Sequence, residues 1–286
     1  MPSAPGTAQE TEARVHVQKL SEQLRNQFLI DFKPGASTII GLAFVSKAAP
    51  DGYTLLLAGP SFTLLPLRTI PLPFDPLRAF LPISLLSKRW TTIVVHPSLP
   101  STPSEFISYA KANPGKVNFG TNGVGGGSHL TGAWLADATR IEMTFIHYKS
   151  AALMIPDLIA GRVHITPFTM ATALPLVKSG KLKFLGLTNS IRNPAAPDLP
   201  TLTEQGIQDV EYSSWLGVLA PEKTPTHIIN LLHSEIAKAV KSPDVIKRLS
   251  DETQLIGSTP EQFAHHINTE TERWRKLVKE ANISLE

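Results

Sequence analysis

Cysteine is absent from the 286 residues. Its absence excludes disulfides, cysteine-ligated zinc sites and a cysteine nucleophile, and it is compatible with an oxidising compartment. Charged residues are few, at 18%, and the formal net charge is only +3, so the composition does not indicate a nucleic-acid-binding protein. No apolar run approaches the roughly 20 residues that a membrane-spanning helix needs. Hydrophobic residues make up 42% of the chain, enough for a folded core, and the length suggests about two domains.

Short apolar runs alternate with helix-like periods along the chain. Apolar positions at helical spacing predict a helix over residues 13–24, and an apolar run predicts a strand over residues 28–32. The stretches that begin at Thr102 and Thr259 each combine a capping box with proline at the first helical position. This alternation predicts an α/β fold with largely parallel or mixed sheets flanked by helices.

Two apolar strands that end in proline, residues 93–97 and 216–221, look alike. If both cross between two lobes, they form a paired hinge, and one lobe is inserted in the other. The predicted domains are then a first lobe of residues 1–99 and 221–286 and an inserted lobe of residues 100–220. The alternative is two ordinary strand–helix units within one sheet.

The most informative segment joins a predicted strand to a predicted helix and carries four glycines in five residues, from Gly123 to Gly127. Glycine lets backbone N–H groups approach a ligand closely, and the helix start adds a partial positive charge. The segment therefore predicts an anion site for a carboxylate or phosphate; the alternative is a tight turn that needs small residues. The candidate contacts are Thr121, Asn122, Gly123, Gly125 and Ser128.

Known catalytic and nucleotide motifs fit this segment poorly. Gly126 stands where a P-loop has its lysine, and the chain contains no Gly-x-Ser-x-Gly motif. His129 is interpreted as packed or solvated in the first helical turn, and the pair His265-His266 as part of a solvated helix face. No histidine spacing indicates a metal site.

Two further loops are candidates for binding. One contains Gly6 and Thr7 ahead of the first helix, and the other contains Gly59 and Ser61 after an apolar strand. Ligands of parallel sheets bind outside the carboxyl ends of the strands, so these loops and the glycine segment are expected to face one crevice. Simple turn hydrogen bonding is the alternative for Ser61.

Several runs are similar to one family of proteins. They are Lys33-Pro-Gly-Ala-Ser37, Ala48-Ala-Pro-Asp-Gly-Tyr-Thr-Leu-Leu-Leu57, Leu72-Pro-Phe-Asp-Pro76, Val95-His-Pro-Ser-Leu-Pro100, Ala112-Asn-Pro-Gly-Lys116, Tyr148-Lys149, Asp198-Leu-Pro-Thr201 and Ala220-Pro221. In this order they resemble the Bug family (Bordetella uptake gene type), the solute receptors of tripartite tricarboxylate transporters. The resemblance covers nearly the whole chain.

The resemblance implies a two-lobed periplasmic binding protein, type II-like, with two hinge crossovers and closure on its ligand. It implies a small ligand, commonly a carboxylate, held between the lobes largely by backbone amides of the three loops. It implies no catalytic residue, metal or cofactor. The partners it implies are the carboxylate and the transporter's membrane components, with no nucleic acid, and we expect a monomer.

The sequence departs from the family's pattern in its first loop, its inserted lobe and its start. The first loop usually reads Pro-Pro-Gly-Gly with an Asp soon after, whereas here Glu10 is near that position. The inserted lobe often reads Phe-Asp-Asn, whereas here it reads Pro167-Phe168-Thr169. Because Phe168 cannot pair with a ligand amine, we expect it to line the cleft and to favour a ligand with an apolar or aromatic part.

The family's first strand and signal peptide are missing ahead of Pro5 in the sequence as given. We therefore expect the first lobe to lack a strand, through an upstream gene start or a truncation. The leading hypothesis is an extracytoplasmic, periplasmic carboxylate receptor. The alternatives are an α/β hydrolase-like enzyme acting through Ser128 or His129, and a truncated copy that is not exported.

Overall fold

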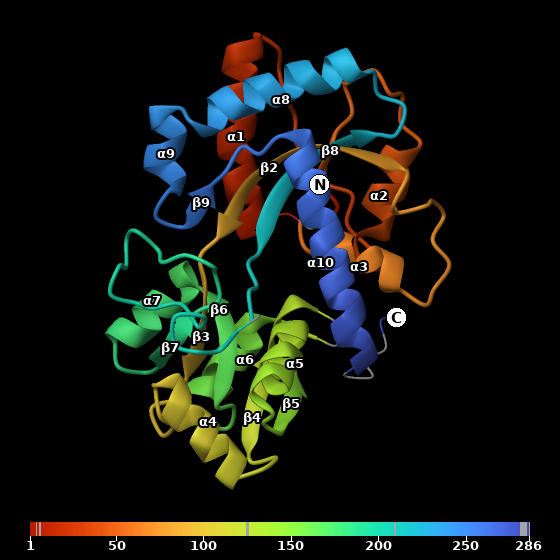
Figure 1. The fold of residues 1–286 in the computed structure, drawn as a ribbon. Helices are drawn as coiled ribbons and strands as arrows, with labels where there is room; N and C mark the ends of the chain where they lie inside the picture. The colour runs from red at the N-terminus through yellow and green to blue at the C-terminus, as the bar shows by residue number, and fades with distance from the viewer. Residues whose placement is uncertain (4, 6, 124–125, 209, 281–284, 286) are drawn as a thin grey trace. The chain divides into compact units, whose positions relative to one another are not determined.

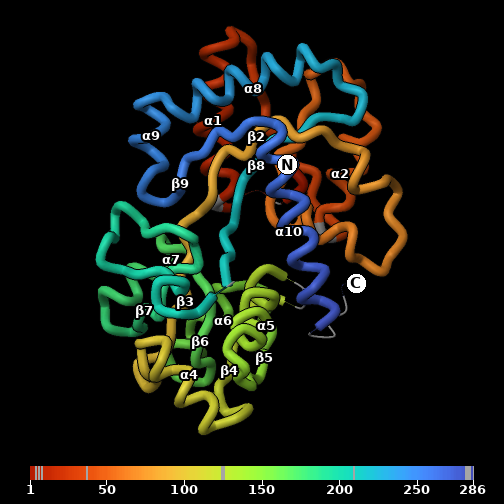
Figure 2. The backbone as a smooth tube through the Cα atoms, viewed as in Figure 1, coloured from red at the N-terminus to blue at the C-terminus, as the bar shows by residue number. Residues whose placement is uncertain are grey.

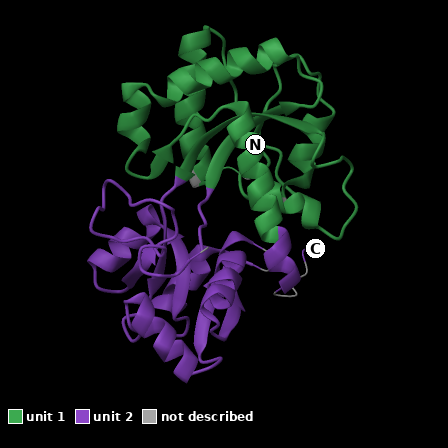
Figure 3. Ribbon diagram, in the orientation of Figure 1, with its two compact units in different colours: residues 1–88, 215–274 green, residues 89–214, 275–286 purple. Residues whose placement is uncertain are grey.

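The computed structural model divides the chain into two compact units, and it describes all residues except 4, 6, 124–125, 209, 281–284 and 286. Unit 1 comprises Met1–Lys88 and Trp215–Trp274, and unit 2 comprises Arg89–Ser214 and Arg275–Glu286 (Figure 3). In the part of the chain that is described, no helix is both long enough and apolar enough to cross a membrane.

Unit 1 is built on a four-stranded sheet in the order β1-β8-β2-β9 (Figure 1). Strand β8 runs antiparallel to both β1 and β2. The elements that lie wholly or mostly in unit 1 are α1 (Ala8–Leu24), the 3-10 turn η1 (Ala36–Thr38), α2 (Ile39–Ser46), β1 (Leu56–Ala58), α3 (Ser61–Leu64), the 3-10 turn η2 (Leu65–Leu67), β2 (Phe80–Arg89), β8 (Trp215–Pro221), α8 (Thr226–Val240), α9 (Pro243–Leu249), β9 (Thr253–Leu255) and α10 (Pro260–Glu280), of which β2 and α10 end in unit 2.

The unit 1 sheet buries apolar side chains on both faces. Along β8, Leu216 and Val218 join a core cluster that contains residues of α1 and α8. Trp215 and Leu219 join a second cluster that contains residues of α2 and α10. The alternation follows from the two-residue period of a strand, and it makes all seven residues of β8 buried.

Unit 2 is built on a five-stranded mixed sheet in the order β5-β4-β6-β3-β7. Strand β4 runs parallel to β5 and β6, whereas β3 runs antiparallel to β6 and β7. The elements are β3 (Thr91–Val95), α4 (Pro103–Ala112), β4 (Val117–Thr121), α5 (Gly127–Thr139), β5 (Met143–His147), α6 (Ala151–Ile159), β6 (Ile165–Thr169), α7 (Met170–Lys178) and β7 (Lys183–Leu187).

The α/β class with mixed, helix-flanked sheets is confirmed, but two expectations about strands are wrong. The sheets are not largely parallel, because β8 and β3 each run against both of their neighbours. Residues 28–32 form no strand. Next to this segment, the Met1 ammonium donates to the Asp31 carbonyl and the Met1 carbonyl accepts from the Lys33 N–H.

The divisions between the units lie upstream of the predicted domain borders at residues 99/100 and 220/221. Strand β3 pairs with β6 and β7, so residues 91–95 belong to unit 2. Strand β8 pairs with β1 and β2, so residues 215–221 belong to unit 1. The predicted hinge strands are therefore interior strands of the two sheets, and the chain changes unit at Lys88/Arg89, Ser214/Trp215 and Trp274/Arg275.

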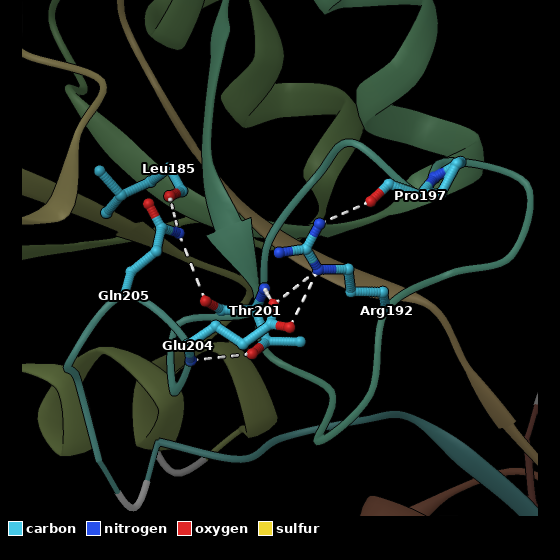
Figure 4. Close-up of polar contacts among 6 residues, drawn as sticks. All are labelled: Leu185, Arg192, Pro197, Thr201, Glu204 and Gln205. Atoms are coloured by element: carbon cyan, nitrogen blue, oxygen red, sulfur yellow. Dashed lines mark hydrogen bonds and ion pairs between the residues drawn. The ribbon is translucent and has the colours of Figure 1, made fainter.

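A long connection follows β7, and Figure 2 shows its path before β8. Arg192 pairs with Glu204 at 2.9 Å and also donates to the carbonyl oxygen of Pro197 (Figure 4). Glu204 accepts from Thr201 N–H while its own N–H donates to the Thr201 hydroxyl. The Thr201 N–H and then the Arg192 guanidinium lower the pKa of Glu204. Local polar contacts thus fix a connection that has little regular structure.

Candidate functional site

The carboxyl ends of three unit 2 strands meet at one edge of the sheet. They meet because β4 is parallel to both β5 and β6. The three strands end at Thr121, His147 and Thr169, and the helices α5, α6 and α7 begin shortly after them. Helix starts carry unpaired N–H groups and a partial positive charge, and ligands of such sheets bind at this edge. The edge is therefore suited to an anion.

Hydrogen bonds join the described ends of the glycine segment, Asn122–Gly123 and Gly126–Ser128, between β4 and α5. The Asn122 N–H donates to the Ser128 hydroxyl at 2.8 Å, and the Gly126 N–H donates to the Gly123 carbonyl at 3.4 Å. Gly123 has φ +118°, and among the described residues no heavy atom beyond its chain neighbours lies within 4 Å of the position that a Cβ would take. Glycine is thus needed at this position for its backbone conformation.

A pair of histidines packs beneath this loop. The Thr121 hydroxyl lies 2.6 Å from Nδ1 of His147. The His129 ring meets the rings of His147 and Phe145 edge-on, at centroid distances of 4.9 and 5.0 Å. Burial, and then the neighbouring His147, lower the pKa of His129. His129 is therefore a packed ring in the first turn of α5, which agrees with the sequence interpretation.

The end of β5 is fixed by its own polar contacts. The Tyr148 N–H donates to the carbonyl oxygen of Thr121 at 2.9 Å, and the Tyr148 hydroxyl donates to Asp157 at 2.6 Å. Arg162 pairs with the same carboxylate at 2.6 Å. Loss of solvation and then Asp157 raise the pKa of Tyr148 to about 12, and the Tyr148 hydroxyl and then Arg162 lower the pKa of Asp157. These contacts hold the ends of β4 and β5 together.

Tyr212 is a neighbour of the glycine loop that sequence reasoning missed. A Cβ at Gly127 would overlap the Tyr212 hydroxyl and ring, so the phenol lies directly against the start of α5. Its position is set by Thr188, which accepts from Tyr212 N–H and donates its hydroxyl to the Tyr212 carbonyl. Gly127 is thus required for close packing rather than for its dihedral angles.

The unit 1 candidates lie around Gln9. Thr7 is the N-cap of α1 and accepts from the Glu10 N–H at 3.2 Å. The Gln9 amide donates to the carbonyl oxygen of Trp215 at 3.2 Å, and a Cβ at Gly59 would overlap this amide. Ser61 begins α3 two residues later. The structure therefore brings the start of α1 and the end of β1 together at Gln9, which the sequence did not single out.

A buried carboxyl group lies next to the Trp215 backbone and was also missed. Glu270 accepts from the Trp215 indole at 2.8 Å and from the Thr63 hydroxyl at 3.3 Å. Burial raises its pKa to about 7. His266 lies 3.6 Å away, and burial lowers its pKa to about 3. We conclude that both groups are neutral near pH 6, and the expectation of a solvated His266 is wrong because Trp215 and Phe263 cover its ring.

The remaining predicted residues differ in their surroundings. Phe168 is 5% exposed and packs in a unit 2 core cluster with Val94, Met154 and Leu158. Its packing contacts come from the core, and its influence on ligand choice stays a prediction. Gly6 and Gly125 lie outside the described residues. Among the residues that are described, no group of three or more histidines and carboxylates could hold a metal ion.

Comparison with known proteins shows which family this chain is similar to. The sequence profile described as the tripartite tricarboxylate transporter family receptor matches residues 12–283. Protein BugT of Bordetella pertussis (strain Tohama I) is 31% identical over 290 residues, which cover 100% of this chain and 89% of BugT.

Two solved structures that are similar to this chain contain a bound dicarboxylate. The R. palustris protein Rpa4515 with adipate has a TM-score of 0.83 and 30% identity, covering 99% of this chain and 96% of that chain. MatC from Rhodopseudomonas palustris with bound malate has a TM-score of 0.76 and 26% identity, covering 97% of this chain and 96% of that chain.

Proposed function

Since the chain belongs to the tripartite tricarboxylate transporter receptor family, we propose that it binds a small dicarboxylate and delivers it unchanged to a membrane transporter of that type. The observation that carries this proposal is the unit 2 edge, where three helices begin after neighbouring strand ends and one of these helices follows the glycine segment. The adipate and malate bound to Rpa4515 and MatC support a ligand with two carboxylates.

In this proposal, backbone and hydroxyl groups bind the ligand. One carboxylate contacts Thr121, Asn122, Gly123 and Ser128 of the glycine loop. Within unit 1, Thr7, Gly59 and Ser61 are the proposed contacts, and Gln9 orders them through its bond to the Trp215 carbonyl. N–H groups at a helix start bind a carboxylate without a matching basic side chain. The mechanism needs no cofactor and no proton transfer.

Receptors of this family are periplasmic binding proteins, and we place this chain in the same compartment. Its partners are then the carboxylate and the transporter's membrane components, and each monomer binds one ligand.

A hydrolase is the weaker candidate. A serine nucleophile needs a general base within hydrogen-bonding distance. The Ser128 hydroxyl accepts from Asn122 N–H, and the His129 ring packs against Phe145 and His147 instead. A receptor needs no serine nucleophile and no general base next to it.

A thermal-shift panel tests the function. We expect adipate, malate or another dicarboxylate to raise the melting temperature, because a ligand that binds only the folded state stabilises by RT ln(1 + [L]/Kd), about 2.7 kcal/mol at 100 Kd. Succinate should stabilise more than aspartate if the ammonium group lacks a partner. NMR spectra of the recovered acid should be unchanged. Conversion of the acid, or stabilisation by no dicarboxylate, would refute the receptor function.

Replacing Ser128 tests the order of the glycine loop. Ser128→Ala removes the acceptor of the Asn122 N–H, and a lost hydrogen bond of this kind is worth about 1 kcal/mol. We expect the dicarboxylate to bind about fivefold more weakly, measured by calorimetry. Ser108→Ala is the matched control, since its hydroxyl donates to the Ser104 carbonyl within α4. Equal affinity of both variants would contradict this role of Ser128.

A further inference from the structure

A buried carboxyl group connects three elements of unit 1 next to one of the candidate binding loops. Glu270 lies on α10, which passes beside α3 in Figure 1. Its Oε2 is 2.8 Å from the Trp215 indole nitrogen on β8 and 3.3 Å from the Thr63 hydroxyl on α3. The three residues are 8%, 1% and 0% exposed, respectively. Because water has little access to these polar groups, they must satisfy one another.

The Thr63 hydroxyl has two acceptors for its one hydrogen. Besides the Glu270 carboxyl group, the carbonyl oxygen of Pro60 lies 2.8 Å from this hydroxyl. When Glu270 is a neutral acid, its O–H can donate to the Thr63 oxygen while Thr63 donates to Pro60. An ionised Glu270 can only accept and is the stronger acceptor, so it takes the Thr63 hydrogen away from Pro60. The protonation state of Glu270 therefore decides which bond Thr63 makes.

The bond to Pro60 stabilises the start of α3, where two proposed ligand contacts lie. Pro60 is the N-cap of α3 and provides no side-chain cap. The helix comprises only Ser61–Leu64, and a helix of one turn is not stable without tertiary contacts. The Thr63 N–H donates to the same Pro60 carbonyl at 3.1 Å. Loss of the hydroxyl bond therefore loosens the loop of residues 59–61, which contains the proposed contacts Gly59 and Ser61.

We propose that Glu270 is a positioning residue for the carboxylate site: as a neutral acid it keeps the Thr63 hydroxyl on Pro60 and residues 59–61 in their binding conformation, and as a carboxylate it releases them. This inference rests on the proposed function, since residues 59–61 are ligand contacts only there. Binding of the dicarboxylate and binding of a proton to Glu270 then favour each other, because coupling between two sites is reciprocal.

The groups around Glu270 place this switch near neutral pH. Burial raises the pKa of Glu270 to about 7. Lys88 of β2 and Arg273 of α10 oppose this rise, and the value of about 7 includes both. His266 of α10 lies 3.6 Å away, and burial lowers its pKa to about 3, so it carries no charge near pH 7. Dicarboxylate binding should therefore weaken as the pH rises through 7.

The exchange of the hydroxyl bond can be measured without a ligand. In NMR spectra recorded from pH 5 to pH 8, the Pro60 carbonyl carbon and the Trp215 indole N–H should shift with a midpoint near 7 in the unchanged protein. Both signals should stay constant in Glu270→Gln, because glutamine does not ionise. A Pro60 signal that stays constant in the unchanged protein, or that shifts equally in Glu270→Gln, would overturn the proposal.

Calorimetry with adipate at pH 6.5 and pH 8.5 tests the coupling to binding. We expect about three- to fivefold weaker binding at pH 8.5 in the unchanged protein, the effect of one lost hydrogen bond, and equal affinities in Glu270→Gln. Thr63→Val lacks the hydroxyl but keeps the shape of the side chain, so its affinity should not change with pH. Thr271→Val is the matched control: its buried hydroxyl donates to the Ile267 carbonyl within α10, and the variant should keep the pH dependence.

The outcomes separate the positioning role from the proposed function. If adipate binds the unchanged protein equally well at both pH values, the positioning role of Glu270 is wrong and the receptor function stands. If the pH dependence persists in Thr63→Val, the charge of Glu270 acts on the ligand directly and the proposal is also wrong. Absence of binding by any dicarboxylate at pH 6.5 would refute the receptor function and the positioning role together, even where the Pro60 signal titrates.

Discussion

Replacing Gly123 with valine is expected to weaken dicarboxylate binding roughly ten- to a hundredfold. Gly123 has φ +118°, a conformation that β-branched residues rarely adopt. Among the described residues beyond its chain neighbours, no heavy atom lies within 4 Å of the Cβ position, so the expected effect comes from the backbone. A turned peptide plane misdirects the loop's N–H groups, and a charge-assisted hydrogen bond is worth about 1.5–3 kcal/mol. Isothermal titration calorimetry measures the change.

Gly180 provides the matched control. It also has a positive φ, +71°, and open space at its Cβ position, but it lies in the turn between α7 and β7. Gly180→Val should therefore lower the melting temperature and leave the affinity unchanged. If Gly123→Val folds and binds as tightly as the unchanged protein, the glycine loop does not hold the carboxylate.

Replacing Glu270 with glutamine is expected to remove a large pH dependence of stability. Burial raises the pKa of Glu270 to about 7 in the folded protein, whereas an unfolded chain has a glutamate pKa near 4.3. Glu270 therefore binds a proton on folding between these values. Its contribution is fully present below about pH 4.3 and is lost as the pH rises through 7, by roughly 4 kcal/mol.

The readout is the difference in urea unfolding free energy between Glu270→Gln and the unchanged protein at pH 5 and pH 8. Taking this difference cancels the opposite effect of His16, whose pKa burial lowers to about 4. Glutamine keeps an acceptor for the Trp215 indole and the Thr63 hydroxyl, so the variant should gain relative stability toward pH 8. Lys88 and Arg273 act on the same carboxyl group and oppose the rise of its pKa, and the value of about 7 already includes them.

Glu204→Gln is the control for this pH series. Glu204 is a surface carboxylate whose pKa is lowered by the Thr201 N–H and by Arg192. Its stabilising contribution is present above the ordinary glutamate pKa and is lost only as the pH falls below it. The relative stability of Glu204→Gln should therefore stay flat from pH 5 to pH 8. A flat profile for Glu270→Gln as well would contradict a neutral buried carboxyl group.

Local signals predicted the helices well. The box at Thr259 forms as expected, with Thr259 N–H donating to the Gln262 side chain and Gln262 N–H donating to the Thr259 hydroxyl. Such contacts join residues three positions apart, so the sequence contains both partners. The glycine run likewise predicted the loop between β4 and α5, because strand, glycines and helix are contiguous.

Strand direction and long-range contacts could not be predicted from local signals. An apolar run has the same appearance in a parallel and an antiparallel strand, so the directions of β3 and β8 were missed. Gln9 and the Trp215 carbonyl are 206 positions apart in the chain. Likewise, the sequence pattern of α10 placed His266 on a solvated helix face and did not indicate that its ring packs against Trp215 and Phe263. These contacts depend on how the sheet of unit 1 assembles.

The most direct test of the carboxylate-receptor assignment is a calorimetric titration of the unchanged protein with adipate and malate, beside dimethyl adipate and the matching diamide. The account predicts saturable binding of one dicarboxylate per chain, no binding of the uncharged ester or diamide, and recovery of the acid unchanged. Equal binding of the ester and the acid would show that the N–H groups of the glycine loop do not recognise a negative charge, and it would contradict the account.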